Sequence, residues 1–450
     1  MVLSDAAKDK QLWAESYNEK INNPEDIVRL QSKIAETISV EIEARITPEE
    51  KLRIEKSPTA SITAYEIYQK GNEEHWKFVN DNNLDALLRA ENLFNAALEF
   101  DSTFAMAYNG LAKVYLEGNF NSSFLNENYL DTVLMFAELA LSYDNQLAEA
   151  YTIKGICYTG KGNPEQALKE FDKALAYNPN FWKAYRGKGQ LYQYGDQLSA
   201  IKNFDKAVSL YHGRERAKLL NDIGISYYAA GLMEYGHMYF QEKLELDHDS
   251  AEYFNVLAVA ENWLGNFRKS LDYGKKAYSY DSSSLVISDR LAYNYMFLGE
   301  YEKSLRYYEK MVNHMLSNEI PDNVNTHRYA YIYWKTGNRE KGAYLFNLEI
   351  EYCLRMNELG RKWEDQRYTF YDLAAVYAFL GEKDKAYENL RAFNQRQYMD
   401  VWMVTLIKDD PLFESIRNEP EYQQIVREVE GKYQAQRKRV QQWLEENDML

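Results

Sequence analysis

Residues 148–181 read AEAYTIKGICYTGKGNPEQALKEFDKALAYNPNF, and this stretch decides the fold. It predicts two helices joined by a short glycine-containing turn. Gly155 in the first helix and Ala167 in the second are small enough to let the paired helices approach closely, while Phe171 fills the space beside them. Pro179 stops the second helix, because a helix ends at or before the residue that precedes a proline. The stretch is therefore one helix-turn-helix unit.

The same pattern recurs in register along most of the chain. Its spacing of a large residue, a small residue, an aromatic and a turn glycine, followed by alanine, aromatic and alanine, resembles the tetratricopeptide repeat. About nine copies are expected between Ser61 and Phe393. Downstream copies are marked by Tyr185, Leu220, Phe254, Leu291, Tyr329 and Phe370, and two divergent upstream copies by Phe94 and Tyr108. The second divergent copy carries an Asn-rich insertion between Asn119 and Asn128, which we expect to be a surface loop.

The resemblance implies an all-α fold, a right-handed α-solenoid superhelix with helical flanks. Stacked neighbours of such an array share one continuous core. We expect a repeat array over residues 61–396 and C-terminal capping helices over 397–450. Pro411 and Pro420 each start a helix there, and a long polar helix with a wet outer face follows from about Tyr422 to Asn447. The basic cluster of Arg437, Lys438 and Arg439 in that helix is expected to be a solvated face.

The N-terminal flank resembles the end of a TolB-like α/β domain. The run Leu12-Trp13-Ala14-Glu15 reads as the end of a strand, and an amphipathic helix with Ile27, Leu30, Ile34 and Ile38 follows. Residues 1–22 are therefore expected to be a remnant of that domain and residues 23–60 to be linker helices. Proteins with this order are bacterial, and they carry a helix-turn-helix or class III cyclase domain upstream. The resemblance thus implies a regulatory fragment that begins inside the α/β domain.

Composition narrows the function classes. The chain has 450 residues, and 53 Lys and Arg against 69 Asp and Glu give a net charge of −16, which argues against a general binder of nucleic-acid backbones. The two cysteines, Cys157 and Cys353, cannot form a disulfide framework. No run of about 18 apolar residues predicts a membrane span. We expect a cytoplasmic protein, or a periplasmic one if a membrane span precedes Met1.

No enzyme, cofactor or metal site is predicted. The six histidines show no HxxxH or HExxH spacing, so a zinc site built on one helix is not indicated. The SxxK match at residues 199–202 falls at the start of a repeat's second helix and lacks accompanying catalytic motifs.

The resemblance places a ligand in the concave groove, which the first helix of each repeat lines at its second, fifth, ninth, twelfth and thirteenth positions. Aromatic and amide side chains there suit an extended peptide. Each of them could equally pack against a neighbouring repeat. The predicted groove residues are Lys183, Arg186, Gln190, Tyr194, Lys218, Asn221, Tyr228, Asn255, Asn262, Trp263, Asp289 and Tyr293.

The Lys and Asn clamp of chaperone-tail binders is not reproduced, because its positions read Thr152 and Ile156, or Arg186 and Gln190. Lys183, Arg186 and Lys218 form a mild basic spot for an acidic partner.

Two functions are kept open. The first is a non-enzymatic protein- or peptide-binding scaffold, the partner-binding arm of a bacterial signalling or transcription protein. The alternative is a small-molecule-sensing solenoid that controls an upstream cyclase or DNA-binding domain, which the many Tyr and Trp residues near the groove suggest. A homodimer through tyrosine-rich faces is a third possibility.

Overall fold

The structure is a computed structural model. It describes residues 2–5, 10–14, 55–81, 83–122, 129–193, 195–317, 326–359 and 362–448, with residues 26, 29, 30, 32–34, 36, 37 and 51. The chain divides into two compact units, residues 1–157 and residues 158–450, and each is described by itself.

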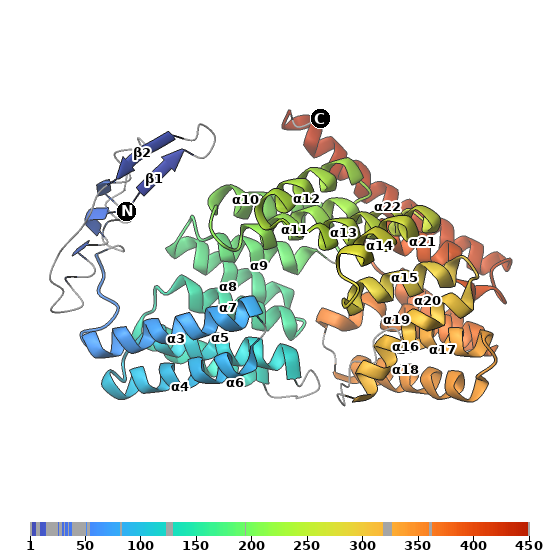
Figure 1. Ribbon diagram of the computed structural model, residues 1–450, viewed down its shortest axis with the longest axis horizontal. Coiled ribbons are helices and arrows are strands. Elements are labelled where there is room, and N and C mark those ends of the chain that lie inside the picture. Colours follow the sequence, from blue (N-terminus) through green and yellow to red (C-terminus); the bar gives the residue numbers. More distant parts are fainter. Residues whose placement is uncertain are drawn as a thin grey trace. The chain divides into compact units, whose positions relative to one another are not determined.

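The first unit contains a short antiparallel strand pair and the first helical hairpins (Figure 1). Val2 pairs with Ala14 and Leu3 with Trp13, so the Leu-Trp-Ala run does form a strand. Helix α3 packs on α4, α4 on α5, and α5 on α6. The elements are β1 (Val2–Asp5), β2 (Lys10–Ala14), α3 (Ile62–Asp81), α4 (Leu84–Phe100), α5 (Ala105–Ser122), α6 (Tyr129–Tyr143) and α7 (Ala148–Gly160), whose last turn belongs to the second unit.

The second unit continues the array and ends in three further helical elements. The array helices are α8 (Pro164–Tyr177), α9 (Trp182–Tyr192), α10 (Gln197–Leu210), α11 (Arg216–Ala229), α12 (Met233–Asp247), α13 (Ser250–Trp263), α14 (Phe267–Tyr280), α15 (Leu285–Phe297), α16 (Tyr301–Ser317), α17 (Thr326–Lys335), α18 (Arg339–Leu359), α19 (Lys362–Leu380) and α20 (Lys383–Asn394). The C-terminal segment comprises α21 (Val401–Asp409), the 3-10 helix η1 (Pro411–Phe413) and α22 (Pro420–Glu446).

Among the described residues, α3 pairs with α4 and α5 with α6 in the first unit, and in the second unit the helices pair in order from α9 with α10 to α19 with α20. The all-α solenoid fold is confirmed. Glycine allows the close approach of helices: a Cβ at Gly189 of α9 would lie 2.5 Å from the ring of Phe204 in α10. Glycine also makes the turns. Gly265, between α13 and α14, has a φ of +79°, a left-handed conformation that favours glycine. The glycines of the repeat pattern therefore matter for two reasons: they let helices approach closely, and they adopt the turn conformation between helices.

The C-terminal segment, for which the sequence predicted capping helices, contacts more than the last repeat. It turns back and packs on helices whose sequence lies about 200 residues earlier: α21 contacts α11 and α13, while α22 contacts α10 as well as α20 (Figure 1). Helix α21 is buried on all sides from Val401 to Ile407. Other elements must therefore cover every face of this helix, because its hydrophobic side chains point in all directions.

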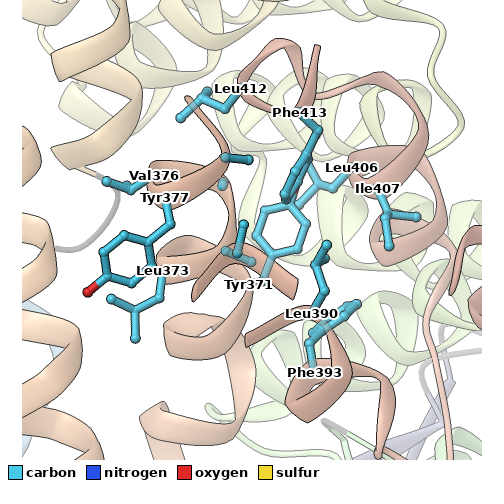
Figure 2. Packing of buried hydrophobic residues seen from close by; sticks show 14 of the residues in the cluster. Tyr371, Leu373, Val376, Tyr377, Leu390, Phe393, Leu406, Ile407, Leu412 and Phe413 are labelled. Carbon is cyan, nitrogen blue, oxygen red and sulfur yellow. The ribbon is translucent and has the colours of Figure 1, made fainter. Parts of the chain in front are cut away.

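Apolar packing joins this segment to the last repeats. The ring of Tyr371 in α19 lies 5.4 Å from that of Phe413 and 5.6 Å from that of Phe393 in α20. Figure 2 shows these rings gathered with Leu406 and Ile407 of α21. The cluster extends from Ala292 to Tyr433 and forms the main core of the second unit.

A buried hydrogen-bond network also joins the C-terminal segment to the start of α10. Gln197 at the start of α10 donates from Nε2 to Asp400 Oδ1 at 3.0 Å, and its backbone N–H donates to Gln436 Oε1 at 3.1 Å. Gln436 donates back to Asp400 Oδ1 at 3.1 Å. Arg439 then bonds Asp196, so the basic cluster of α22 is not simply a solvated face.

Two of the predicted segments are described only in part. Residues 119–122 of the Asn-rich insertion belong to helix α5 and not to a loop, while residues 123–128 lie outside the described residues. The expected linker helices are described only in part, with helical residues between 26 and 37.

Candidate functional site

Five of the predicted groove residues form a set that we call the polar strip: Lys183 and Arg186 of α9, Lys218 and Asn221 of α11, and Asn255 of α13. They occupy the second and fifth positions of successive first helices. Four of these residues are half-buried, and Lys218 is exposed. Because the repeats stack in register, these positions recur on one face of the array.

An ion pair joins two repeats along the polar strip. Arg186 Nε lies 2.7 Å from Asp222 Oδ2, and the two side chains are 26% and 13% exposed. Burial raises the pKa of Asp222, and the charges of Arg186 and Lys218 oppose that rise. Two cations therefore share one anion here. With Lys183 the strip keeps an excess of positive charge in a chain that is acidic overall.

Hydrogen-bonding capacity is also left over on the strip. The side-chain Oδ1 of Asn255 is buried, and the structure gives it no hydrogen-bond partner. A buried amide oxygen without a partner costs free energy. Lys183 lies over the ring of Trp182 at 5.4 Å, and Gln190 is half-buried.

Two predicted groove residues belong instead to the core. Tyr228 is completely buried, with its ring 5.1 Å from that of Phe240. Asn262 is 3% exposed and donates to Asn294 Oδ1 at 3.0 Å. The expectation that these two face a ligand is wrong, because the twelfth position of the first helix is buried here, against the same helix pair at Tyr228 and against the next one at Asn262.

Three other predicted residues lie beside the C-terminal segment or near its contacts. The backbone oxygen of Trp263 accepts a hydrogen bond of 2.6 Å from Thr405 of α21. Asp289 accepts one of 3.2 Å from Tyr329, and Tyr293 lies 5.3 Å from the Arg328 guanidinium. The electrostatic neighbours of Tyr293 include Asp410, next to α21. Trp263 therefore contacts the chain's own C-terminal segment, whereas Asp289 and Tyr293 contact α17. Tyr194 lies outside the described residues.

Sequence reasoning missed the role of α21, although a signal was present. Residues 401–407 read VWMVTLI, and a helix that is apolar all round is one that is buried all round.

It also missed a buried cluster of His327, Glu349 and Asp372 from three successive helices. His327 Nδ1 lies 3.5 Å from Glu349 Oε1, and its Nε2 lies 3.5 Å from Asp372 Oδ1. No spacing within one helix could reveal it. The one available signal was the repeat register, which places His327 and Asp372 at the fifth and sixth positions of neighbouring first helices.

A family model described as the tetratricopeptide repeat matches residues 148–181. The chain is a tetratricopeptide repeat protein. Within the described residues, none of its helices combines the length and apolar character needed to cross a membrane.

Known proteins are similar to this tetratricopeptide repeat protein at low identity. Anaphase-promoting complex subunit 3 of Schizosaccharomyces pombe is 22% identical over 180 residues, which are 40% of this chain and 26% of that protein. The chain thus spans about a quarter of the length of this curated relative.

The similarity of this chain to solved structures concerns the fold alone. The Rap conjugation gene regulator of plasmid pLS20, solved with a Phr peptide, shares 14% identity over 75% of this chain and 97% of its own, with a TM-score of 0.49. A tetratricopeptide repeat protein from Parabacteroides merdae shares 16% identity over 63% of this chain and 98% of its own, with a TM-score of 0.40.

Proposed function

We propose that this chain is a non-enzymatic scaffold whose polar strip binds an extended, acidic segment of a partner protein. Tetratricopeptide repeats are in general a protein- or peptide-binding fold, so the class of function follows from the repeat itself. The observation that carries the finer proposal is the polar strip, where Arg186 and Lys218 both act on Asp222 and Lys183 adds a third cationic side chain.

The chemistry of the strip selects the kind of segment. Lysine and arginine attract carboxylates, and Asn221 and Asn255 can bond the backbone of an extended chain. A helix would satisfy its own backbone groups, whereas an extended segment keeps N–H and C=O groups free to bond amide side chains on the strip.

We further propose that the chain serves as the partner-binding arm of a bacterial signalling or transcription protein. The support is the resemblance of the N-terminal flank to the end of a TolB-like domain. The strand pair of β1 and β2 lies in that flank, and β2 contains the Leu-Trp-Ala run.

Fluorescence anisotropy with two labelled peptides tests the acidic-segment proposal. One peptide alternates Glu with Ser and the other alternates Lys with Ser, and the full chain is titrated into each. We expect the acidic peptide to bind, and its affinity to fall as salt is raised, because salt screens exposed charges. The basic peptide should show no binding.

Charge reversal then locates the site. Arg186→Glu and Lys218→Glu should each weaken binding of the acidic peptide about tenfold. Lys218 is exposed, so its reversal leaves the fold intact even if Arg186→Glu disturbs the buried Asp222. Lys169→Glu, on an exposed position of α8, is the matched control and should leave binding unchanged. Equal loss in all three variants, or none in the strip variants, would contradict the proposal.

A further inference from the structure

A buried cluster in the second unit has a geometry that hydrogen bonding does not explain. His327 of α17, Glu349 of α18 and Asp372 of α19 are 0%, 0% and 2% exposed. Each offers one ligand atom, and the three atoms lie within 4.8 Å of one another. Both ring nitrogens of His327 and Asp372 Oδ1 are buried and have no hydrogen-bond partner in the structure.

A neutral imidazole does not suit this position. It carries one N–H, yet both of its nitrogens face a carboxylate, at 3.5 Å each. One nitrogen lone pair would therefore lie against a carboxylate. Two buried carboxylates are unfavourable unless positive charge comes with them, and the buried Arg328 guanidinium supplies part of that charge to Asp372.

The spacing suits a shared ion. A zinc ion holds nitrogen and oxygen ligands at about 2.1 Å, so two tetrahedral ligand atoms lie about 3.4 Å apart. An ion takes one ring nitrogen of His327, and each nitrogen lies 3.5 Å from a different carboxylate, so this spacing is present for one carboxylate at a time. The ligand atoms of all three residues lie within 4.8 Å of one another, and hydrogen-bonded pairs are closer than about 3.2 Å.

Neighbouring groups support the same arrangement. Thr326 and the backbone N–H of His327 donate to Glu349 Oε2, which fixes that carboxylate while Oε1 faces the ring. Outer hydrogen bonds of this kind orient metal ligands in proteins. The thiol of Cys353, one helical turn after Glu349, lies 3.6 Å from Oε1 and could become a fourth ligand by a small rotation.

We propose that His327, Glu349 and Asp372 bind a divalent transition-metal ion of the Zn²⁺ class. An imidazole with two carboxylates and a nearby thiol favours zinc over magnesium or calcium, which take oxygen ligands alone. The ion would join α17, α18 and α19. Its role would be structural, because the surroundings are buried.

Metal analysis of the full chain, purified without a metal-affinity tag or chelator, tests this proposal. We expect about one zinc per chain by mass spectrometry. Apo-protein prepared with EDTA should melt at a lower temperature and recover when zinc is restored, because an ion that binds the folded state stabilises it. Cobalt added to the apo-protein should give the visible absorption bands of a tetrahedral Co²⁺ site. These measurements need no variant.

Variants assign the ligands. His327→Gln and Asp372→Asn should each lower zinc affinity at least tenfold. The matched control is His75→Gln, which removes a histidine that faces one carboxylate only, with Nε2 2.8 Å from Glu117 Oε2. This control should keep full zinc stoichiometry.

A chain that contains no zinc, gains no stability from added zinc and shows no cobalt bands would overturn the proposal. The cluster would then be a histidine between two carboxylates that holds no metal ion. Equal loss of zinc in the His75→Gln control would overturn the assignment to these three residues.

Discussion

At the scale of single residues, the same amino acid has opposite effects in different parts of this chain. Gly189 lies where α9 and α10 approach, and a Cβ there would meet the ring of Phe204 at 2.5 Å. Gly431 lies in the exposed middle of α22, and a Cβ there would meet nothing within 4 Å. The effect of adding a methyl group is therefore set by packing at Gly189 and by helix propensity at Gly431.

We therefore expect Gly189→Ala to lower the free energy of unfolding by about 2 kcal/mol, because an extra methyl must displace a packed ring. Gly431→Ala should raise it by about 1 kcal/mol, since alanine is the better helix former. Urea denaturation followed by circular dichroism measures both. A loss of stability in Gly431→Ala would mean that α22 contacts something at this residue that the structure does not show.

Asp400 should make the stability of the second unit depend on pH. Burial raises its pKa to about 6, against the hydrogen bonds from Gln197 and Gln436 and the charge of Arg396. A carboxyl with a raised pKa favours the folded state while it is protonated. The stability that protonated Asp400 contributes is therefore fully present below the unfolded pKa of about 4. It is lost as the pH rises to about 6, and above that pH the free energy of unfolding no longer changes because of this group.

Asp400→Asn removes this titration and keeps an acceptor at Oδ1 for both glutamines. The difference in unfolding free energy between variant and wild type should change in favour of the variant by about 3 kcal/mol between pH 4 and pH 8. Urea midpoints at five pH values measure it. Glu388→Gln, at an exposed position of α20, is the control and should give a constant difference. A constant difference for Asp400→Asn as well would show that its carboxyl does not titrate in this range.

At the scale of elements, the sequence predicted what repeats and missed what does not. The turn glycines and the Gly189 contact follow from the repeat pattern, because each depends on neighbours a few residues away. The positions of α21 and α22 do not, since contacts such as Thr405 with Trp263 join residues 142 apart. The groove prediction failed at Tyr228 and Asn262 for a different reason, because their partners Phe240 and Asn294 lie within the array and bury them. The repeat register gives the position of a side chain on its helix and not its burial.

Helix α21 contributes to stability through its buried face. Ile407 is fully buried, while Lys408 beside it is exposed and pairs with Glu430 at 2.8 Å. We expect Ile407→Ala to cost about 3 kcal/mol, because the cavity adds to the lost hydrophobic transfer free energy. Lys408→Ala should change stability by less than about 0.5 kcal/mol, since exposed ion pairs contribute little. Urea denaturation of the two variants side by side decides. Equal costs would show that α21 is not packed as described.

At the scale of the second unit, the C-terminal segment changes how the array behaves. In an open solenoid each repeat contacts only its neighbours, so a local defect stays local. Here α22 contacts both α10 and α20, and its far end packs Val440 and Leu444 against Ile201 and Leu220. Helices remote in sequence therefore share one packing element and should lose stability together.

Val440→Ala tests this coupling. The side chain is fully buried, so its truncation should cost about 2 kcal/mol. Amide hydrogen exchange measured by mass spectrometry should then speed up in α10 and α11, and also in α20, which Val440 does not touch but α22 does. Gln442→Ala, an exposed substitution on the same helix, should change neither region. If the faster exchange is confined to residues 197–232, the array responds as an open solenoid, and α22 only covers its surface without coupling its repeats.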